Sequence, residues 1–121
     1  MKTFRDLIAW QKAMVLVTAV YLESKQFPKD ELYGLTSQIR RSAVSIPSNL
    51  AEGYGRKSLG EYVRFIQIAI ASLFELQTQL EIAMNLEYLE RDSFTRLFED
   101  SREIERMLSS LVAKLNQSQA K

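Results

Sequence analysis

The 121-residue sequence contains no cysteine and no histidine, and only four glycines and two prolines. Without cysteine there can be no disulfide framework, no thiolate zinc site and no cysteine nucleophile. Histidine is the commonest general base and the commonest metal ligand, so its absence removes most hydrolase and metalloenzyme designs. Few glycines and prolines argue against a turn-rich β fold. We therefore expect an all-α protein that is not an enzyme and uses no metal and no cofactor.

The sequence also lacks a long apolar run. Its most apolar stretch, residues 13–22, is far shorter than the ~20 residues that a membrane-spanning helix needs. The first residues have no apolar segment typical of a secretory signal peptide. We expect a cytoplasmic protein with no membrane contact. The length is that of one domain, 1–121, which needs no disulfide or metal to fold.

Apolar residues recur three and four positions apart in four segments, which is the spacing typical of helices. The predicted helices cover residues 5–25, 32–53, 58–86 and 91–116. Short connections between long helices favour an antiparallel, up-down-up-down four-helix bundle. Pro47 lies inside the second helix. We expect a kink there rather than a chain reversal, because proline removes one backbone hydrogen bond and clashes with the preceding turn.

The segment 34–57 gives the second helix an unusually polar inner face. Asn49 occupies an inward position and needs hydrogen-bond partners, because an unsatisfied buried amide costs about 1–3 kcal/mol. We expect its side chain to be at least partly buried and bonded to another helix. We interpret Arg41, Asn49 and Glu52 as a polar network that fixes helix register. The alternative is that these residues line a surface for a ligand or a nucleic acid.

Positive charge gathers in the first half of the chain. Residues 1–64 carry ten Lys and Arg against six Asp and Glu, whereas residues 65–121 carry six against nine. Such a distribution is typical either of solvated helix ends or of a patch for an anionic partner. The free backbone N–H groups expected at the start of the third helix favour a phosphate contact there. The candidate nucleic-acid-binding residues are Arg40, Arg41, Tyr54, Arg56, Lys57 and Arg64.

The first helix carries more apolar residues than one bundle core needs. Ile8, Val15 and Leu22 belong to its main stripe, and further apolar residues widen the arc to roughly two-thirds of the circumference, against about 100° for a surface helix. An uncovered surplus would exceed the apolar patches usual for monomers. A second copy is the simplest cover. The candidate subunit-contact residues are Trp10, Val17, Val20, Val63, Ile70 and Phe74.

Four stretches of the sequence carry a resemblance to a known family. They are Phe4-x-Asp6-Leu7-x-x-Trp10-Gln11-Lys12-Ala13, Phe27-Pro28-Lys29-x-Glu31-x-x-Gly34-Leu35-Thr36-x-Gln38-Ile39-Arg40-Arg41-Ser42, Ser45-Ile46-Pro47-x-Asn49-x-Ala51-Glu52-Gly53-Tyr54-Gly55-Arg56 and Ser72-Leu73-x-Glu75-Leu76. On these residues the chain resembles the four-helix bundle protein family, also called the large-subunit ribosomal RNA intervening-sequence (S23-type) proteins. The resemblance implies a left-handed antiparallel bundle, a ring-shaped homopentamer and no enzymatic activity.

Two functional hypotheses follow. The first is a non-enzymatic homo-oligomeric adaptor, preferably a pentamer, that is encoded in or near ribosomal RNA intervening sequences and contacts RNA or DNA through the clustered cations. The second is a structural or protein-interaction scaffold that binds no nucleic acid. Salt separates the two hypotheses, because nucleic-acid binding weakens steeply as salt is added.

Overall fold

The computed structural model describes the backbone of residues 1–120 and the side chains of residues 1–118. This part of the chain forms four long helices and no strand: α1 (Ile8–Ser24), α2 (Leu35–Tyr54), α3 (Leu59–Asn85) and α4 (Arg91–Ala120). Short 3-10 turns, η1 (Phe4–Asp6) and η2 (Lys29–Glu31), precede α1 and α2. The predicted all-α fold class is confirmed. The last residue of the predicted domain, Lys121, lies outside the described residues.

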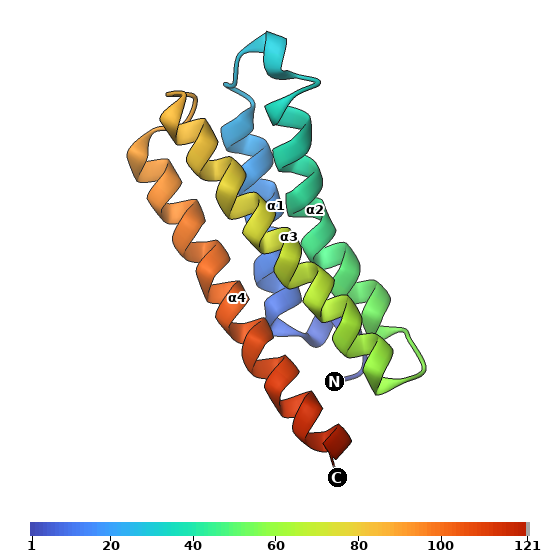
Figure 1. Ribbon diagram of the computed structural model, residues 1–121. Coiled ribbons are helices and arrows are strands. Elements are labelled where there is room, and N and C mark those ends of the chain that lie inside the picture. The colour runs from blue at the N-terminus through green and yellow to red at the C-terminus, as the bar shows by residue number, and fades with distance from the viewer. Residues whose placement is uncertain (121) are drawn as a thin grey trace.

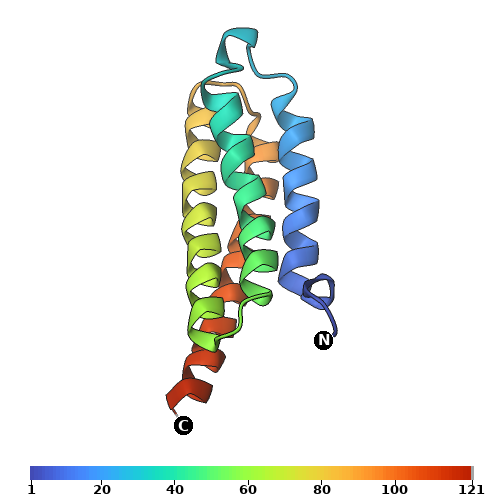
Figure 2. The same ribbon diagram turned by 90° about the vertical axis from the view of Figure 1, so that its right-hand side faces the viewer.

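The four helices lie side by side in a bundle (Figure 1). Each packs against its neighbours in the chain, and α1 also packs against α4. Figures 1 and 2 show the chain reversing direction between each helix and the next. Within the described residues α1 has no close backbone contact with α3, nor α2 with α4. These two pairs of helices therefore occupy diagonal corners of the bundle.

The first helix begins at Ile8, three residues later than predicted, because the preceding residues close a turn of their own. The Thr3 hydroxyl accepts a hydrogen bond from the Arg5 N–H at 3.1 Å. The Asp6 carboxylate accepts from the N–H groups of Lys2 at 2.8 Å and Thr3 at 3.2 Å. These hydrogen bonds lower the pKa of Asp6 below its ordinary value. The N-terminus is thus held as a capped turn beside the bundle.

Each helix contributes one stripe of buried side chains to a single core. The stripe of α1 consists of Ala9, Ala13, Leu16, Val20 and Ser24. The main stripe predicted from the sequence instead points outward, since Ile8, Val15 and Leu22 are all exposed. The prediction was wrong because α1 is apolar on two sides, and its neighbours cover the side with the smaller alanine residues.

Helix α2 passes through Pro47 without reversing direction, as predicted. It runs unbroken from Leu35 to Tyr54, and Pro47 itself is buried. The helix starts three residues later than predicted because η2 and Gly34 precede it, and the Glu31 carboxylate accepts from the Leu35 N–H at 3.1 Å. At the other end of the chain, α4 continues to Ala120, four residues beyond the predicted end.

Candidate nucleic-acid interface and polar groove

A polar seam joins α2 to α3 inside the bundle. The Ser42 hydroxyl lies 2.6 Å from the side-chain oxygen of Gln79, and both residues are buried. One turn further along, the hydroxyls of Ser45 and Ser72 share a hydrogen bond of 2.8 Å. Small serine side chains let the two helix backbones approach closely, and each hydroxyl finds a partner on the facing helix. The seam therefore fixes the register of α2 against α3.

Asn49 belongs to this seam, although not in the predicted manner. Its side chain is partly buried, as predicted. Its Nδ2 donates to the backbone oxygen of Ser45 at 2.8 Å and to the Ser45 hydroxyl at 2.9 Å, both on its own helix. The predicted partner on another helix was wrong, because the four-residue spacing already brings Ser45 within reach. Only Ser45 continues the chain of hydrogen bonds across to Ser72 on α3.

The predicted network of Arg41, Asn49 and Glu52 is not formed among the described residues. Arg41 is exposed and bonds to neither of the others, and Glu52 pairs with Arg56 one turn later at 3.1 Å. The distance along α2 explains this, since Glu52 lies eleven positions after Arg41, which is about 16 Å at 1.5 Å per residue. Register is instead held by the pairs Ser42–Gln79 and Ser45–Ser72.

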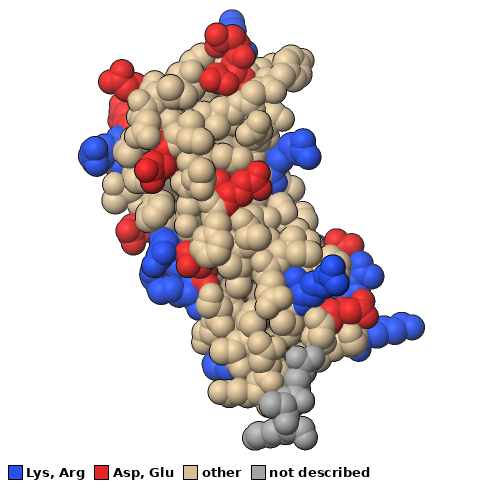
Figure 3. Space-filling model, viewed as in Figure 1, with Lys and Arg blue, Asp and Glu red and all other residues tan. Residues whose placement is uncertain are grey.

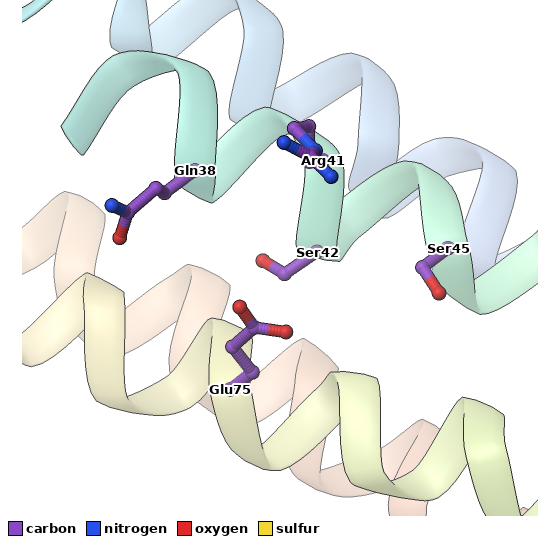
Figure 4. A pocket seen from close by; sticks show the side chains of 5 residues that line it. All are labelled: Gln38, Arg41, Ser42, Ser45 and Glu75. Atoms are coloured by element: carbon purple, nitrogen blue, oxygen red, sulfur yellow. The ribbon is translucent and has the colours of Figure 1, made fainter. Parts of the chain in front are cut away.

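Above the seam lies a groove of about 320 Å³. Figure 4 shows the residues that line it: Gln38, Arg41, Ser42 and Ser45 on α2, and Glu75 on α3. The Glu75 carboxylate accepts a hydrogen bond of 3.2 Å from Gln79, which ties the groove to the seam. The groove therefore offers a guanidinium, a carboxylate and two hydroxyls that can form hydrogen bonds with a polar ligand. Within the described residues no cluster of three or more acidic side chains could hold a metal ion.

The two adjacent arginines of α2 point to different sides of the helix. The Arg40 Nε donates to the Ser24 hydroxyl of α1 at 2.8 Å, and its guanidinium lies 4.8 Å from the centre of the Tyr21 ring. Arg41 lies on the α3 side, in the groove. Arg40 and Arg41 therefore do not form one basic patch, because successive residues of a helix diverge by about 100°.

The remaining nucleic-acid candidates lie at the other end of α2, near its turn into α3. Arg56 pairs with Glu52 and covers the Phe65 ring at 4.7 Å. Lys57 and Arg64 are exposed. Arg41 lies thirteen positions before Tyr54, the last residue of α2, which corresponds to roughly 20 Å along the helix. Arg56 follows two residues later. Figure 3 shows basic side chains near this turn with acidic ones among them.

The start of α3 does not present an empty phosphate site. Ser58 caps the helix by accepting from the Glu61 N–H at 3.1 Å, and its own hydroxyl donates to the Glu61 carboxylate at 3.2 Å. Glu61 thus places a negative charge at the helix end that was predicted to attract phosphate. Tyr54 contacts Tyr62 edge to face, with ring centres 5.9 Å apart, and its hydroxyl donates to the Met1 carbonyl at 3.4 Å.

The predicted subunit-contact residues differ in exposure: two are buried, three are partly buried and one is exposed. Val20 is 1% exposed and Val63 is 7% exposed, so both belong to the core of the monomer. Trp10, Val17 and Ile70 are partly buried against that core. Of the six predicted residues only Phe74, at 49%, presents a largely exposed side chain. The prediction was wrong for Val20 and Val63, because the bundle itself covers them.

Sequence reasoning missed the apolar residues that do reach the surface. On α1 the most exposed are Ile8, Val15 and Leu22, which are spaced seven residues apart and so lie on one side of a helix. On α3 they are Ile68 and Ile82, together with Phe74. The seven-residue spacing on α1 was the signal available in the sequence. No helix in the described part of the chain is both long and apolar enough to cross a membrane.

A family model described as 23S rRNA-intervening sequence protein matches residues 5–110 of the chain. Among solved structures, the chain is similar to a protein of unknown function from the S23 ribosomal protein family of Bacteroides thetaiotaomicron. The two are 23% identical, with a TM-score of 0.78 over 86% of this chain and 97% of the other. At this identity the likeness shows the fold alone. No curated protein matches the chain.

Proposed function

Because the chain belongs to the family of 23S rRNA-intervening sequence proteins, we propose that it is a non-enzymatic, cytoplasmic protein that assembles with copies of itself into a ring. The family resemblance makes five the preferred number of subunits. The proposal includes an up-down-up-down, left-handed bundle, and the reversals of chain direction in Figure 1 support the up-down order. The observation that carries the assembly is a pair of apolar faces on two helices.

The first face lies on α1, where Ile8, Val15 and Leu22 are 51%, 68% and 58% exposed. The second lies on α3, where Ile68, Phe74 and Ile82 are 40%, 49% and 42% exposed. Phe74 projects about 80–120° away from the other two, at about 100° per residue. Large apolar side chains gathered on one helix face are typical of interaction surfaces rather than of solvated ones. Each face is therefore suited to packing against another apolar face.

The positions of the two faces favour a ring over a simple dimer. Helices α1 and α3 occupy diagonal corners of the bundle, so their outward faces look in different directions. A contact between α1 of one copy and α3 of the next uses two different surfaces. In an open row of copies joined head to tail, the first and the last copy each keep one face uncovered. Only a closed ring covers both faces of every copy.

Two matched variants test this arrangement by sedimentation equilibrium. Val15→Glu and Phe74→Glu each place a charge in one exposed face, and we expect each variant alone to be monomeric with its helix content retained. Ser109→Glu, at an exposed position of α4, is the control and should assemble like the wild type. A wild-type protein that sediments as a 14.0 kDa monomer would contradict the proposal.

Mixing the two variants distinguishes a head-to-tail contact from a symmetric one. The Val15→Glu chain keeps its α3 face and the Phe74→Glu chain keeps its α1 face, so the mixture retains one intact pair of surfaces. We expect a dimer of one chain of each kind and no larger species. A symmetric contact, in which each face meets its own copy, would instead give separate homodimers of each variant.

We further propose that the assembly contacts RNA or DNA near the α2–α3 turn. Lys57 and Arg64 support this, because both are exposed and neither forms an ion pair within the described residues. Repetition around a ring would strengthen a modest contact by multivalency. Arg56 contributes less to this surface than the sequence suggested, because Glu52 already neutralises its charge.

Filter binding of a labelled RNA and a labelled DNA tests the nucleic-acid contact. Retention should fall steeply as salt rises, since binding releases counterions from the phosphates. The double variant Lys57→Gln/Arg64→Gln should bind more weakly and with a shallower salt dependence. Lys114→Gln, an exposed lysine on α4, is the control. If the wild type retains neither nucleic acid at low salt, the alternative remains: a structural or protein-interaction scaffold.

A further inference from the structure

A second hollow lies at the opposite end of the bundle from the α2–α3 turn. It is bounded by the end of α1, the α1–α2 connection and the first turns of α2, and has a volume of about 350 Å³. Its apolar lining comes from Phe27, Pro28 and Leu32. Phe27 is held from behind by the Tyr88 ring, with ring centres 5.7 Å apart. The volume is at the lower end of the range for small-molecule sites, about 300–1,000 Å³.

One wall of the hollow is a guanidinium that the protein holds in place. Arg40 lines the hollow, and its Nε donates to the Ser24 hydroxyl at 2.8 Å. The flat guanidinium also lies over the Tyr21 ring at 4.8 Å. No carboxylate of the described residues pairs with it. A positioned but unpaired arginine is suited to binding an oxyanion, because little side-chain freedom is lost on binding.

Two further cations line the hollow and no carboxylate does. Lys25 and Lys29 are exposed at its rim. The nearby Glu31 carboxylate is already used, since it accepts from the Leu35 N–H at 3.1 Å and from the Tyr88 O–H at 3.0 Å. The lining therefore combines three positive side chains with an apolar surface. That combination matches a ligand with an anionic group on an apolar body.

Thr36 supplies an independent observation. It lines the hollow, its residue is 4% exposed, and its hydroxyl oxygen is buried with no hydrogen-bond partner in the structure. A buried hydroxyl without a partner destabilises a protein, and nearly all such groups in folded proteins are bonded to something. A change of the Thr36 rotamer would turn this buried oxygen toward the hollow, where a ligand oxygen would provide the missing partner.

We propose that this hollow binds a small organic anion, namely a carboxylate or a phosphate monoester carried on a flat apolar body. The anionic group lies between Arg40 and the two lysines and accepts a hydrogen bond from Thr36, and the apolar body covers Phe27, Pro28 and Leu32. The site does not depend on nucleic-acid binding near the α2–α3 turn, because Arg40 lies fourteen positions before Tyr54, the last residue of α2, which is about 21 Å at 1.5 Å per residue.

Titrations with phenyl phosphate and with benzoate, followed by backbone amide chemical shifts, test the proposal. A ligand with so few atoms binds typically in the millimolar range, so the titration extends to about 10 mM. We expect saturable shifts around Ser24, Phe27 and Thr36 with one or both probes, and weaker shifts with inorganic phosphate or with benzyl alcohol. No saturable change with either aromatic anion would overturn the proposal, and so would equal binding of benzyl alcohol.

Two variants with matched controls complete the test. Arg40→Gln should weaken binding by at least about tenfold, because hydrogen bonds to an ionised partner are the strong ones. Thr36→Val keeps the shape of the side chain and removes the hydroxyl, so it should weaken binding while leaving the unliganded protein equally or more stable. Arg106→Gln and Thr78→Val, both at exposed positions elsewhere, should bind like the wild type. Unchanged affinity in either Arg40→Gln or Thr36→Val would contradict the assigned roles.

Discussion

Replacing Gly53 with alanine tests how closely α2 and α3 pack. Gly53 is buried near the end of α2, and a Cβ built there would lie 2.4 Å from the Cβ and 3.2 Å from the Cγ of Phe65. Non-bonded carbon atoms prefer separations of about 3.5–4.0 Å, so the two helices would have to move apart locally by more than about 1 Å. Phe65 cannot avoid the new methyl by rotating, because the position of its Cβ is set by the backbone of α3.

The two contributions to the stability change have opposite signs. Alanine in place of glycine in a helix interior stabilises by about 1 kcal/mol. Inserting a methyl into a well-packed core costs about 1–3 kcal/mol, and a clash with an immobile atom falls in the upper part of that range. We therefore expect Gly53→Ala to lower the free energy of unfolding by about 1–2 kcal/mol.

Urea denaturation followed by circular dichroism, at one fixed protein concentration, measures this change. Gly55→Ala is the matched control: its nearest neighbour, the Glu52 carbonyl oxygen, would lie 3.6 Å from the new Cβ, and the backbone φ is −81°. That variant should be neutral or more stable by up to about 1 kcal/mol. Adding Phe65→Ala to Gly53→Ala should bring no recovery, since alanine keeps the clashing Cβ. A Gly53→Ala protein as stable as the wild type would refute the argument.

Three further changes test other parts of the structure. Tyr62→Phe removes a buried hydroxyl that has no partner and should be neutral or stabilising by up to about 1 kcal/mol in urea denaturation. Burial raises the pKa of Tyr62 above its ordinary 10.0, so the wild type should lose stability as pH rises through the folded-state pKa. The variant, which has no phenol to titrate, should lose less stability over the same pH range. Ser42→Ala leaves the Gln79 oxygen without its 2.6 Å partner and should destabilise by about 1–3 kcal/mol, whereas Ser42→Ala/Gln79→Leu should recover part of that loss in a double-mutant cycle. Because the pKa of Asp6 is lowered, its carboxylate stabilises the N-terminal turn above about pH 4, and this stabilisation is lost as pH falls through the folded-state pKa. An NMR titration of the Asp6 carboxyl should show the lowered pKa. Asp6→Asn should abolish the pH dependence of the turn.

The predictions that rest on local chemistry agree with the structure. Helix periodicity predicted four helices and no strands, and the structure agrees. The chain passes through Pro47 as a helix because the apolar residues on either side stay in phase. The start of α3 also depends on residues close in sequence, since the Ser58 hydroxyl accepts from the Glu61 N–H. Residues that are close in sequence carry this information, so one sequence is enough to read it.

Only the tertiary structure decided which side of each helix is covered. Spacing shows that Ile8, Val15 and Leu22 share a side of α1, and it shows the same for Ala9, Ala13 and Leu16, but it does not tell which side meets α2 and α4. The partners of polar residues were undecided for the same reason: Arg40 meets Ser24 on another helix, whereas Asn49 stays on its own. The sequence by itself determined the helices and their number. Packing decided the core, the polar seam and the exposed faces, because those depend on distances between residues far apart in the chain.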